Sequence, residues 1–164
     1  MNILMISKID ISKTTGETEH FLGLAHGFVK LKHNITLIVP TPEFGIISNE
    51  MNIISIKCTN NPYLRSLVLQ FKMISLLSLF YFKNKIDFTY IRQGPFFLIP
   101  SLIAKITNRK VISEINGLMQ DDIELLYNPP EFVLLLSKFC EKLSYILSNT
   151  RSSSLRIFKN LNID

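Results

Sequence analysis

The chain has 164 residues, 47% of them apolar and 19% charged, which suits one compact domain with its own core and is too short for two domains of ordinary size. This composition excludes an intrinsically disordered chain. The formal net charge of +5 comes from scattered basic residues and not from a basic run interleaved with aromatics. We therefore predict a single domain, residues 1–164, that does not bind nucleic acid.

The first part of the chain alternates apolar runs with a helical pattern. Asn2–Ser7 is a continuous apolar run followed by a polar loop, which predicts a strand buried on both faces. From Thr18 apolar residues recur with a helical period that closes in the polar residues Lys30, Lys32, His33 and Asn34, so we predict a helix there. The runs Ile35–Val39 and Ile53–Ile56 are short and rich in β-branched residues, which predicts the second and third strands.

The same alternation continues to the end of the chain. A long apolar pattern predicts a helix over Leu64–Phe82, and Phe88–Ile91 is predicted as the fourth strand. A helix over Pro95–Ile106, kinked at Pro100, should lead into a fifth strand over Lys110–Ile115. The last elements we predict are a helix over Glu131–Leu143, a sixth strand over Tyr145–Ser148 and an amphipathic helix over Ser153–Leu161.

Strands that follow one another through helices of this length are normally parallel neighbours, because a tight hairpin is excluded. We therefore predict an α/β fold, a Rossmann-like parallel sheet flanked by helices. In such sheets ligands bind beyond the carboxyl ends of the strands, where the strand order reverses. This rule places the candidate site in the segments 8–20, 92–94 and 114–122.

Four segments at or near these strand ends resemble family 4 glycosyltransferases, which have the two-domain GT-B fold. Thr15–His20 (TGETEH) resembles the family's Gly-Gly-x-Glu-x-His opening, with Thr15 in place of the first glycine. Lys32–Thr36 is similar to its Arg-Gly-His-Glu-Val-Thr passage, and Asp87–Arg92 to Asp-Val-Ile-Tyr-x-Arg. Lys110–Gly117 is similar to Pro-Leu-Val-Leu-Glu-Val-Asn-Gly. The resemblance spans almost the whole chain.

The resemblance implies that this chain is the N-terminal, acceptor-side half of such an enzyme. The activity it implies is retaining transfer of a sugar from a nucleotide-sugar, UDP- or GDP-linked, to a glycan or lipid-linked acceptor. In the resembling enzymes a second domain holds the donor, and the sequence given stops at Asp164 before such a domain. We therefore expect the chain to be inactive alone, to need a donor domain in cis or as a separate chain, and to carry no cofactor or metal of its own.

The loop after the first strand is the candidate contact to the donor phosphates. Gly16 and the backbone amides of Glu17 and Thr18 stand at a helix N-terminus, where N–H groups and the helix dipole favour an anion. An ordinary turn and helix cap is the alternative reading, and the charge of Glu17 opposes an anion.

Candidate acceptor-binding residues come from three strand ends or helix starts. His20 can hydrogen-bond an acceptor hydroxyl or serve a structural role, and Arg92 can meet an acceptor phosphate or carboxylate or be a solvated loop cation. Glu114 suits either the site or a structural ion pair. Asn116 and Gly117 stand where many relatives have His-Gly, and we assign Asn116 a binding role because its amide carries no titratable proton. The acidic pair 121–122 is interpreted as helix-capping charge and not as a metal site.

Two other functions remain open. One is a non-catalytic partner subunit that docks a separate donor-domain chain or recruits a membrane acceptor. The other is a dehydrogenase, which is disfavoured because no GxGxxG follows the first strand.

Several features bear on the compartment. Met1–Ser7 lacks the basic region of a signal peptide, and Cys58 and Cys140 stand far apart with no paired His, so we predict a cytoplasmic protein without zinc or a disulfide framework. The helix over Leu64–Phe82 is interrupted by polar residues and is too short to span a membrane, but its basic stripe (Arg65, Lys72, Lys83) would allow it to lie at the inner membrane face. A core helix of the sheet is the favoured alternative.

Overall fold

A computed structural model of the chain describes residues 1–40, 50–58, 62–94, 96–114, 130–147 and 150–152. Within these ranges six strands form one sheet in the order β3-β2-β1-β4-β5-β6, and every neighbouring pair is parallel. The strands are β1 (Asn2–Ile6), β2 (Asn34–Pro40), β3 (Asn52–Ile56), β4 (Phe88–Arg92), β5 (Val111–Glu114) and β6 (Thr150–Ser152). The predicted Rossmann-like α/β fold is confirmed.

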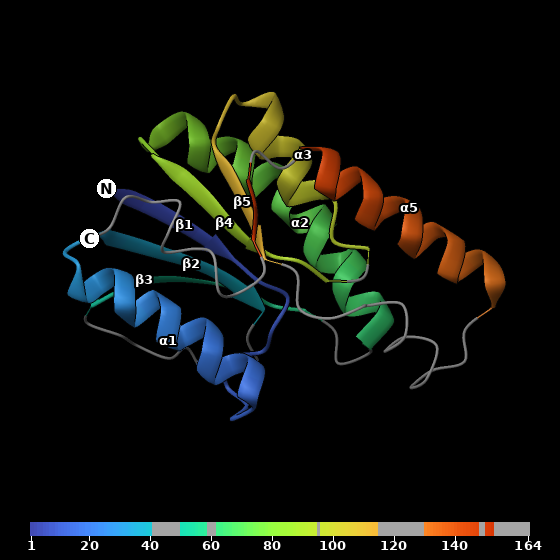
Figure 1. Cartoon of the computed structure of the whole chain (residues 1–164), viewed down its shortest axis with the longest axis horizontal. Helices are drawn as coiled ribbons and strands as arrows, with labels where there is room; N and C mark the ends of the chain where they lie inside the picture. The colour runs from blue at the N-terminus through green and yellow to red at the C-terminus, as the bar shows by residue number, and fades with distance from the viewer. Residues whose placement is uncertain (41–49, 59–61, 95, 115–129, 148–149, 153–164) are drawn as a thin grey trace.

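Helices cover both faces of this sheet (Figure 1). They are α1 (Gly16–Lys30), α2 (Pro62–Lys83), α3 (Ile99–Ile106) and α5 (Glu131–Leu147). Helix α1 lies on one face, while α2, α3 and α5 form the layer on the other, with α3 packed against both of its neighbours. Among the described residues no helix is long and apolar enough to cross a membrane.

The strand order reverses between β1 and β4. The chain moves outward from β1 to β2 and β3, and α2 then carries it back across the sheet to β4 on the other side of β1. Strands on either side of such a switch point send their outgoing loops in opposite directions, which opens a crevice beyond their carboxyl ends. The start of α1 lies at this same edge of the sheet (Figure 1).

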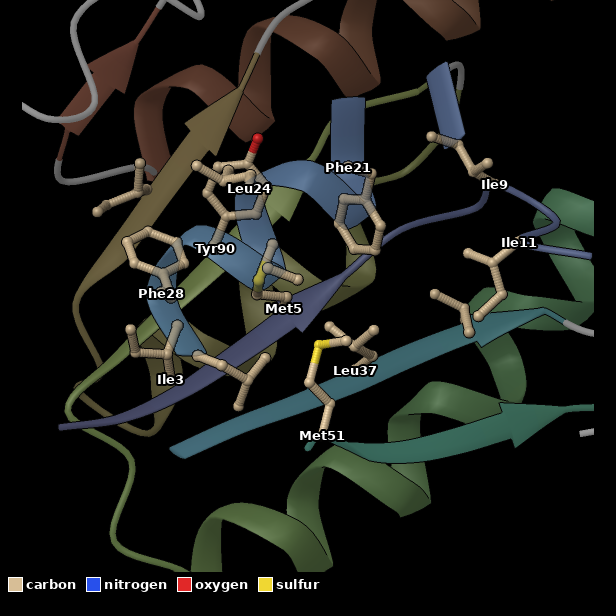
Figure 2. Close-up of a cluster of buried hydrophobic side chains, with 14 of the residues drawn as sticks. Ile3, Met5, Ile9, Ile11, Phe21, Leu24, Phe28, Leu37, Met51 and Tyr90 are labelled. Atoms are coloured by element: carbon tan, nitrogen blue, oxygen red, sulfur yellow. The ribbon is translucent and has the colours of Figure 1, made fainter. Parts of the chain in front are cut away.

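Strand residues alternate between two buried clusters, one on each face. Ile3 and Met5 of β1 pack with Phe21 and Phe28 of α1, and Tyr90 of β4 joins this cluster (Figure 2). Their strand neighbours point to the opposite layer, where Leu4 and Ile6 meet residues of α2 and α3. Because side chains of a strand alternate with a period of two, continuous apolar runs are needed for burial on both faces.

Helix α2 packs on the sheet as a core helix, the alternative favoured from the sequence, while contact of its outer side with a membrane stays a prediction. Leu69, Met73, Leu77 and Tyr81 recur every four residues and are all buried against the sheet. Lys72 is exposed and donates from Nζ to the Lys57 carbonyl at 2.7 Å. This spacing gives the buried stripe of an ordinary sheet-covering helix.

Helix α3 begins later than predicted, and Pro100 does not kink it. The helix starts at Ile99, so that Pro100 stands in the first turn, where its missing N–H costs nothing. The amides of Leu98 and Ile99 both donate to Oε1 of Gln70 in α2, at 2.8 and 3.1 Å. Gln70 therefore caps α3 from the neighbouring helix.

The C-terminal elements correct a second prediction. The segment predicted as a strand over Tyr145–Ser148 is helical as far as Leu147, because α5 continues past the predicted end at Leu143. The sixth strand follows it at Thr150–Ser152 and pairs with β5. The helix predicted over Ser153–Leu161 lies outside the described residues.

Removing the Gln70 cap should destabilise the fold. Gln70→Met keeps the length and apolar stem of the side chain but leaves two partly buried amides without their acceptor, which should lower the free energy of unfolding by about 1–3 kcal/mol. Urea unfolding followed by circular dichroism measures this change. Ser75→Ala, at an exposed position of the same helix, is the control and should change stability by less than about 0.5 kcal/mol. Equal stability of the two variants would show that Gln70 does not cap α3.

Candidate functional site

A cluster of polar and charged side chains lies at the carboxyl ends of β4 and β5, beside the first turn of α1. Arg92 and Glu114 are the last residues of their strands and are paired in the sheet register. Two residues earlier, Tyr90 and Ile112 point into the cluster under α1, so Arg92 and Glu114 lie on the α1 face. The strand ends thus bring together two residues 22 positions apart in the sequence.

Glu114 is the centre of this cluster. Its side chain is fully buried, yet both carboxylate oxygens accept hydrogen bonds. Oε2 accepts from the Tyr90 hydroxyl and from Nη1 of Arg92 at 3.3 Å, while Oε1 lies 2.7 Å from Nε2 of His20. A buried carboxylate is costly unless it is paired and hydrogen-bonded, and these three donors meet that requirement.

Tyr90 is a member of the cluster that the sequence analysis did not single out. Burial, and then the neighbouring Glu114 carboxylate, raise the pKa of its hydroxyl well above the usual range, so it remains a donor across the physiological pH range. Its signal in the sequence was indirect. Tyr90 precedes Arg92 by two residues on one strand and must therefore share its face.

His20 reaches Glu114 from the second turn of α1. Its imidazole is 42% exposed, so one ring nitrogen contacts the buried carboxylate while the ring remains accessible from outside. Because Glu114 accepts at both oxygens, Nε2 carries the proton in this contact, and Nδ1 is then an acceptor in the neutral ring. Among the described residues no side chain or backbone group is bonded to Nδ1, which leaves it available to a hydroxyl donor.

Arg92 is a buried cation held by two carboxylates. Its side chain is 5% exposed, and its Nη2 lies 3.8 Å from Oε1 of the exposed Glu17, in addition to the contact with Glu114. The alternative of a solvated loop cation is therefore wrong. The guanidinium links the start of α1 to the ends of β4 and β5, a task that suits the planar fork of Arg.

The loop before α1 forms a conventional helix cap. Thr15 has an extended backbone, with φ −133° and ψ 158°, and its Oγ1 accepts from the amide of Thr18 at 3.2 Å. The residue in place of the family's first glycine therefore needs no left-handed conformation. Thr18 is buried, and its amide and hydroxyl are both bonded to Thr15.

No described atom of the chain packs directly over Gly16. A Cβ built on Gly16 would meet nothing within 4 Å, so the glycine is not required by packing inside this domain. With Thr18 engaged in the cap, the amides of Gly16 and Glu17 are the ones that the described residues leave for an external anion. Both the cap reading and the anion reading of this loop are compatible with this geometry.

Lys8 and Gly94 meet at the switch point itself. Gly94 follows β4, and a Cβ built there would lie 2.4 Å from Cε of Lys8, so the lysine stem runs directly over the glycine. This contact brings a cationic side chain from the loop after β1 to the loop after β4. Both residues fall in the segments that topology assigned to the crevice, but neither was singled out beforehand.

Other candidates fall elsewhere. Asn116, Gly117 and the acidic pair 121–122 lie outside the described residues. Among the residues that are described, no three metal-ligating side chains gather in one place. An apolar groove of about 580 Å³ lies between α2 and α3, lined by residues such as Phe82 and Ile106 at the C-terminal ends of these helices. It is therefore at the opposite edge of the sheet from the polar cluster.

The Arg92–Glu114 pair should be strongly coupled in stability. Arg92→Met removes the guanidinium that pairs with the buried Glu114 carboxylate and should lower the free energy of unfolding by about 3–5 kcal/mol. Adding Glu114→Gln should recover part of that loss, because the buried charge is then gone as well. Chemical denaturation of both single variants and the double variant gives the coupling energy, expected above about 1 kcal/mol. The exposed pair His26–Glu50, 3.6 Å apart, is the control and should show almost no coupling. Similar coupling in both pairs would contradict the central place of Glu114.

Comparison with known proteins assigns no family: neither a protein-family model nor a curated protein matches this chain.

Proposed function

We propose that this chain is the acceptor-side domain of a retaining, family 4-like glycosyltransferase. The reaction is transfer of a sugar from a UDP- or GDP-sugar to a glycan or lipid-linked acceptor, with the donor held by a second domain in cis or in a separate chain. The domain alone binds no donor tightly and does not catalyse transfer.

One observation carries this proposal. Three of the four segments that resemble the family meet in one hydrogen-bonded cluster: His20 comes from the first, Arg92 from the third and Glu114 from the fourth. His20 and Glu114 are 94 positions apart, so their contact depends on the sheet order and not on local sequence. Resembling segments that converge at the carboxyl ends of β4 and β5, beside the topological switch point, support a shared site.

Within this proposal each residue has a distinct task. His20 accepts a hydrogen bond from an acceptor hydroxyl at Nδ1, and the buried Glu114 positions the imidazole without touching the acceptor. Tyr90 and Arg92 position Glu114 in turn. The amides of Gly16 and Glu17 face the donor phosphates, while the roles of Asn116 and Gly117 in orienting a sugar stay predictions from the sequence.

The ion pairs of Arg92 limit its role in binding an acceptor. Arg92 forms ion pairs with two carboxylates of its own chain, at 3.3 Å to Glu114 and 3.8 Å to Glu17, which makes it a positioning residue more than a binder of acceptor anions. Lys8, whose stem crosses Gly94 at the switch point, is a second cation at this end of the sheet. The acceptor site thus combines a hydrogen-bond acceptor on His20 with a cation from the adjoining loop.

The direct test is sugar transfer by the chain joined to its donor domain. The full product of the gene, or the chain co-expressed with the donor domain that completes it, is assayed for release of nucleoside diphosphate from a panel of UDP- and GDP-sugars. His20→Gln should lower kcat/KM by about 10- to 100-fold, as expected for losing one polar contact of about 1–3 kcal/mol. The control is His26→Gln, an exposed histidine of the same helix, which should stay within about twofold of the parent.

Other outcomes would contradict the proposal in different ways. Absence of turnover with every donor would favour the non-catalytic partner subunit. Tight binding of UDP or GDP by this chain alone would contradict the division of labour between the two domains, and binding of NAD would favour a dehydrogenase.

A further inference from the structure

A groove between two helices that cover the sheet has the dimensions of a small-molecule site. Helices α2 and α3 pack side by side, and the groove between them has a volume of about 580 Å³ (Figure 1). Its floor includes the buried Tyr81 and Ile103, and its rim carries exposed apolar side chains, namely Ile74, Phe82, Leu102 and Ile106. Ligand pockets are commonly of this size and mostly apolar, with a small number of polar groups that orient the ligand.

The charge around the groove has one sign. Neither α2 nor α3 contains an acidic residue, and Asp87 is the sole acidic residue between Pro62 and Ser113. Asp87 is engaged elsewhere, because its Oδ2 accepts a hydrogen bond from the Asn2 amide at 2.7 Å. The exposed Lys83 and Lys105 stand in the last turns of α2 and α3, at the end where the groove lies. These surroundings favour a ligand with a negative charge.

Arg109 brings a positive charge into the lining of the groove. Its guanidinium lies over the Tyr81 ring, 5.8 Å from the ring centroid. Nη2 and Nη1 donate to the carbonyls of Tyr81 and Ile86 at 3.1 and 3.4 Å, while the buried Nε has no partner among the described residues. None of the described carboxylates pairs with Arg109. The end of a helix offers only about half a negative charge, so these carbonyls do not neutralise the guanidinium.

We propose that this groove binds an amphipathic anion, a long-chain carboxylate whose hydrocarbon chain lies between α2 and α3 and whose carboxylate pairs with Arg109. A guanidinium with unused N–H donors suits a carboxylate, and the apolar walls suit the chain. The groove lies at the opposite edge of the sheet from His20 and Glu114. This site is therefore separate from the proposed acceptor site and does not depend on glycosyl transfer.

The shape and charge of the groove disfavour three other occupants. Packed helices have axes about 8–10 Å apart, so the groove between them admits an extended chain but not a partner helix, whose diameter is about 10–12 Å. A second copy would bring two basic grooves together across a twofold axis. A flat bilayer surface would touch the rim, whereas Tyr81 and Ile103 at the floor are within reach of an inserted chain.

Calorimetric titration of the full chain with free carboxylates tests the apolar part of the site. Affinity should rise about 10- to 15-fold from octanoate to decanoate, and again to dodecanoate, because each added methylene is buried in the groove. Ile106→Asn, at the rim, should lower the affinity for each carboxylate by about fivefold or more. The control is Leu79→Asn, at an exposed position of α2 that does not line the groove, and it should leave the affinity unchanged.

Arg109→Gln tests the charged end of the site. This variant should lower the affinity for decanoate by at least tenfold and leave the affinity for 1-decanol, which has the same chain length without the carboxylate, within about twofold. A loss of fold would weaken both ligands alike, so the two titrations separate a lost ion pair from a damaged groove. Lys105→Gln removes an exposed cation that does not line the groove and should change decanoate binding by less than about twofold.

A fluorescence probe locates the bound chain. The protein has no tryptophan, so Phe82→Trp places a single fluorophore on the rim of the groove, and Leu79→Trp places one on the same helix outside it. Dodecanoate should shift the emission of the first to shorter wavelength and leave the second unchanged. The proposal is overturned if no carboxylate binds at up to about 1 mM, if Arg109→Gln weakens decanoate and 1-decanol equally, or if Phe82→Trp responds to phosphatidylglycerol vesicles but not to free dodecanoate.

Discussion

The buried carboxylate of Glu114 is the constraint around which this end of the molecule is arranged. A charge with no exposed surface needs hydrogen-bond donors at fixed positions. Here the donors are Tyr90 and Arg92 of β4 and His20 of α1. Meeting this requirement fixes the relative placement of β4, β5 and the start of α1. The same contacts hold the His20 imidazole with one nitrogen inward and the other toward the crevice. A stability requirement and a functional geometry are thus met by one set of hydrogen bonds.

Most of the sheet was predictable because burial on both faces leaves a plain signal. Runs such as Asn2–Ile6 and Phe88–Arg92 are continuously apolar or nearly so, and their period and length identify strands of a parallel sheet. The failures have physical causes. Residues 145–147 form a short apolar run that fits a strand as well as the end of a helix, and local pattern does not separate the two. The start of α3 depends on Gln70, which acts from another helix and leaves no mark on the segment it caps.

The candidate site was predictable residue by residue but not as a network. His20 lies near the start of the first predicted helix, Arg92 directly after the predicted fourth strand and Glu114 near the end of the predicted fifth strand, so topology alone assigned them to one edge. Their contacts required the strand order, which places β5 next to β4 and both within reach of α1. Tyr90 was missed because a buried aromatic on a strand is ordinarily core, and only its hydroxyl sets it apart. The exposure of apolar residues on α5, such as Phe132 and Phe139, was missed for a similar reason, since helical periodicity gives an apolar stripe but not the direction in which it faces.

The most direct measurement of the central claim is the tautomer of His20. Long-range ¹H–¹⁵N correlation spectra of the imidazole near neutral pH identify which ring nitrogen carries the proton. Our account predicts a proton on Nε2, facing Glu114, and an unprotonated Nδ1 that shifts when an acceptor sugar is bound; this preference should disappear in Glu114→Gln. A proton on Nδ1 in the parent, or spectra that are the same with and without the Glu114 carboxylate, would contradict the claim that Glu114 positions His20 for the acceptor.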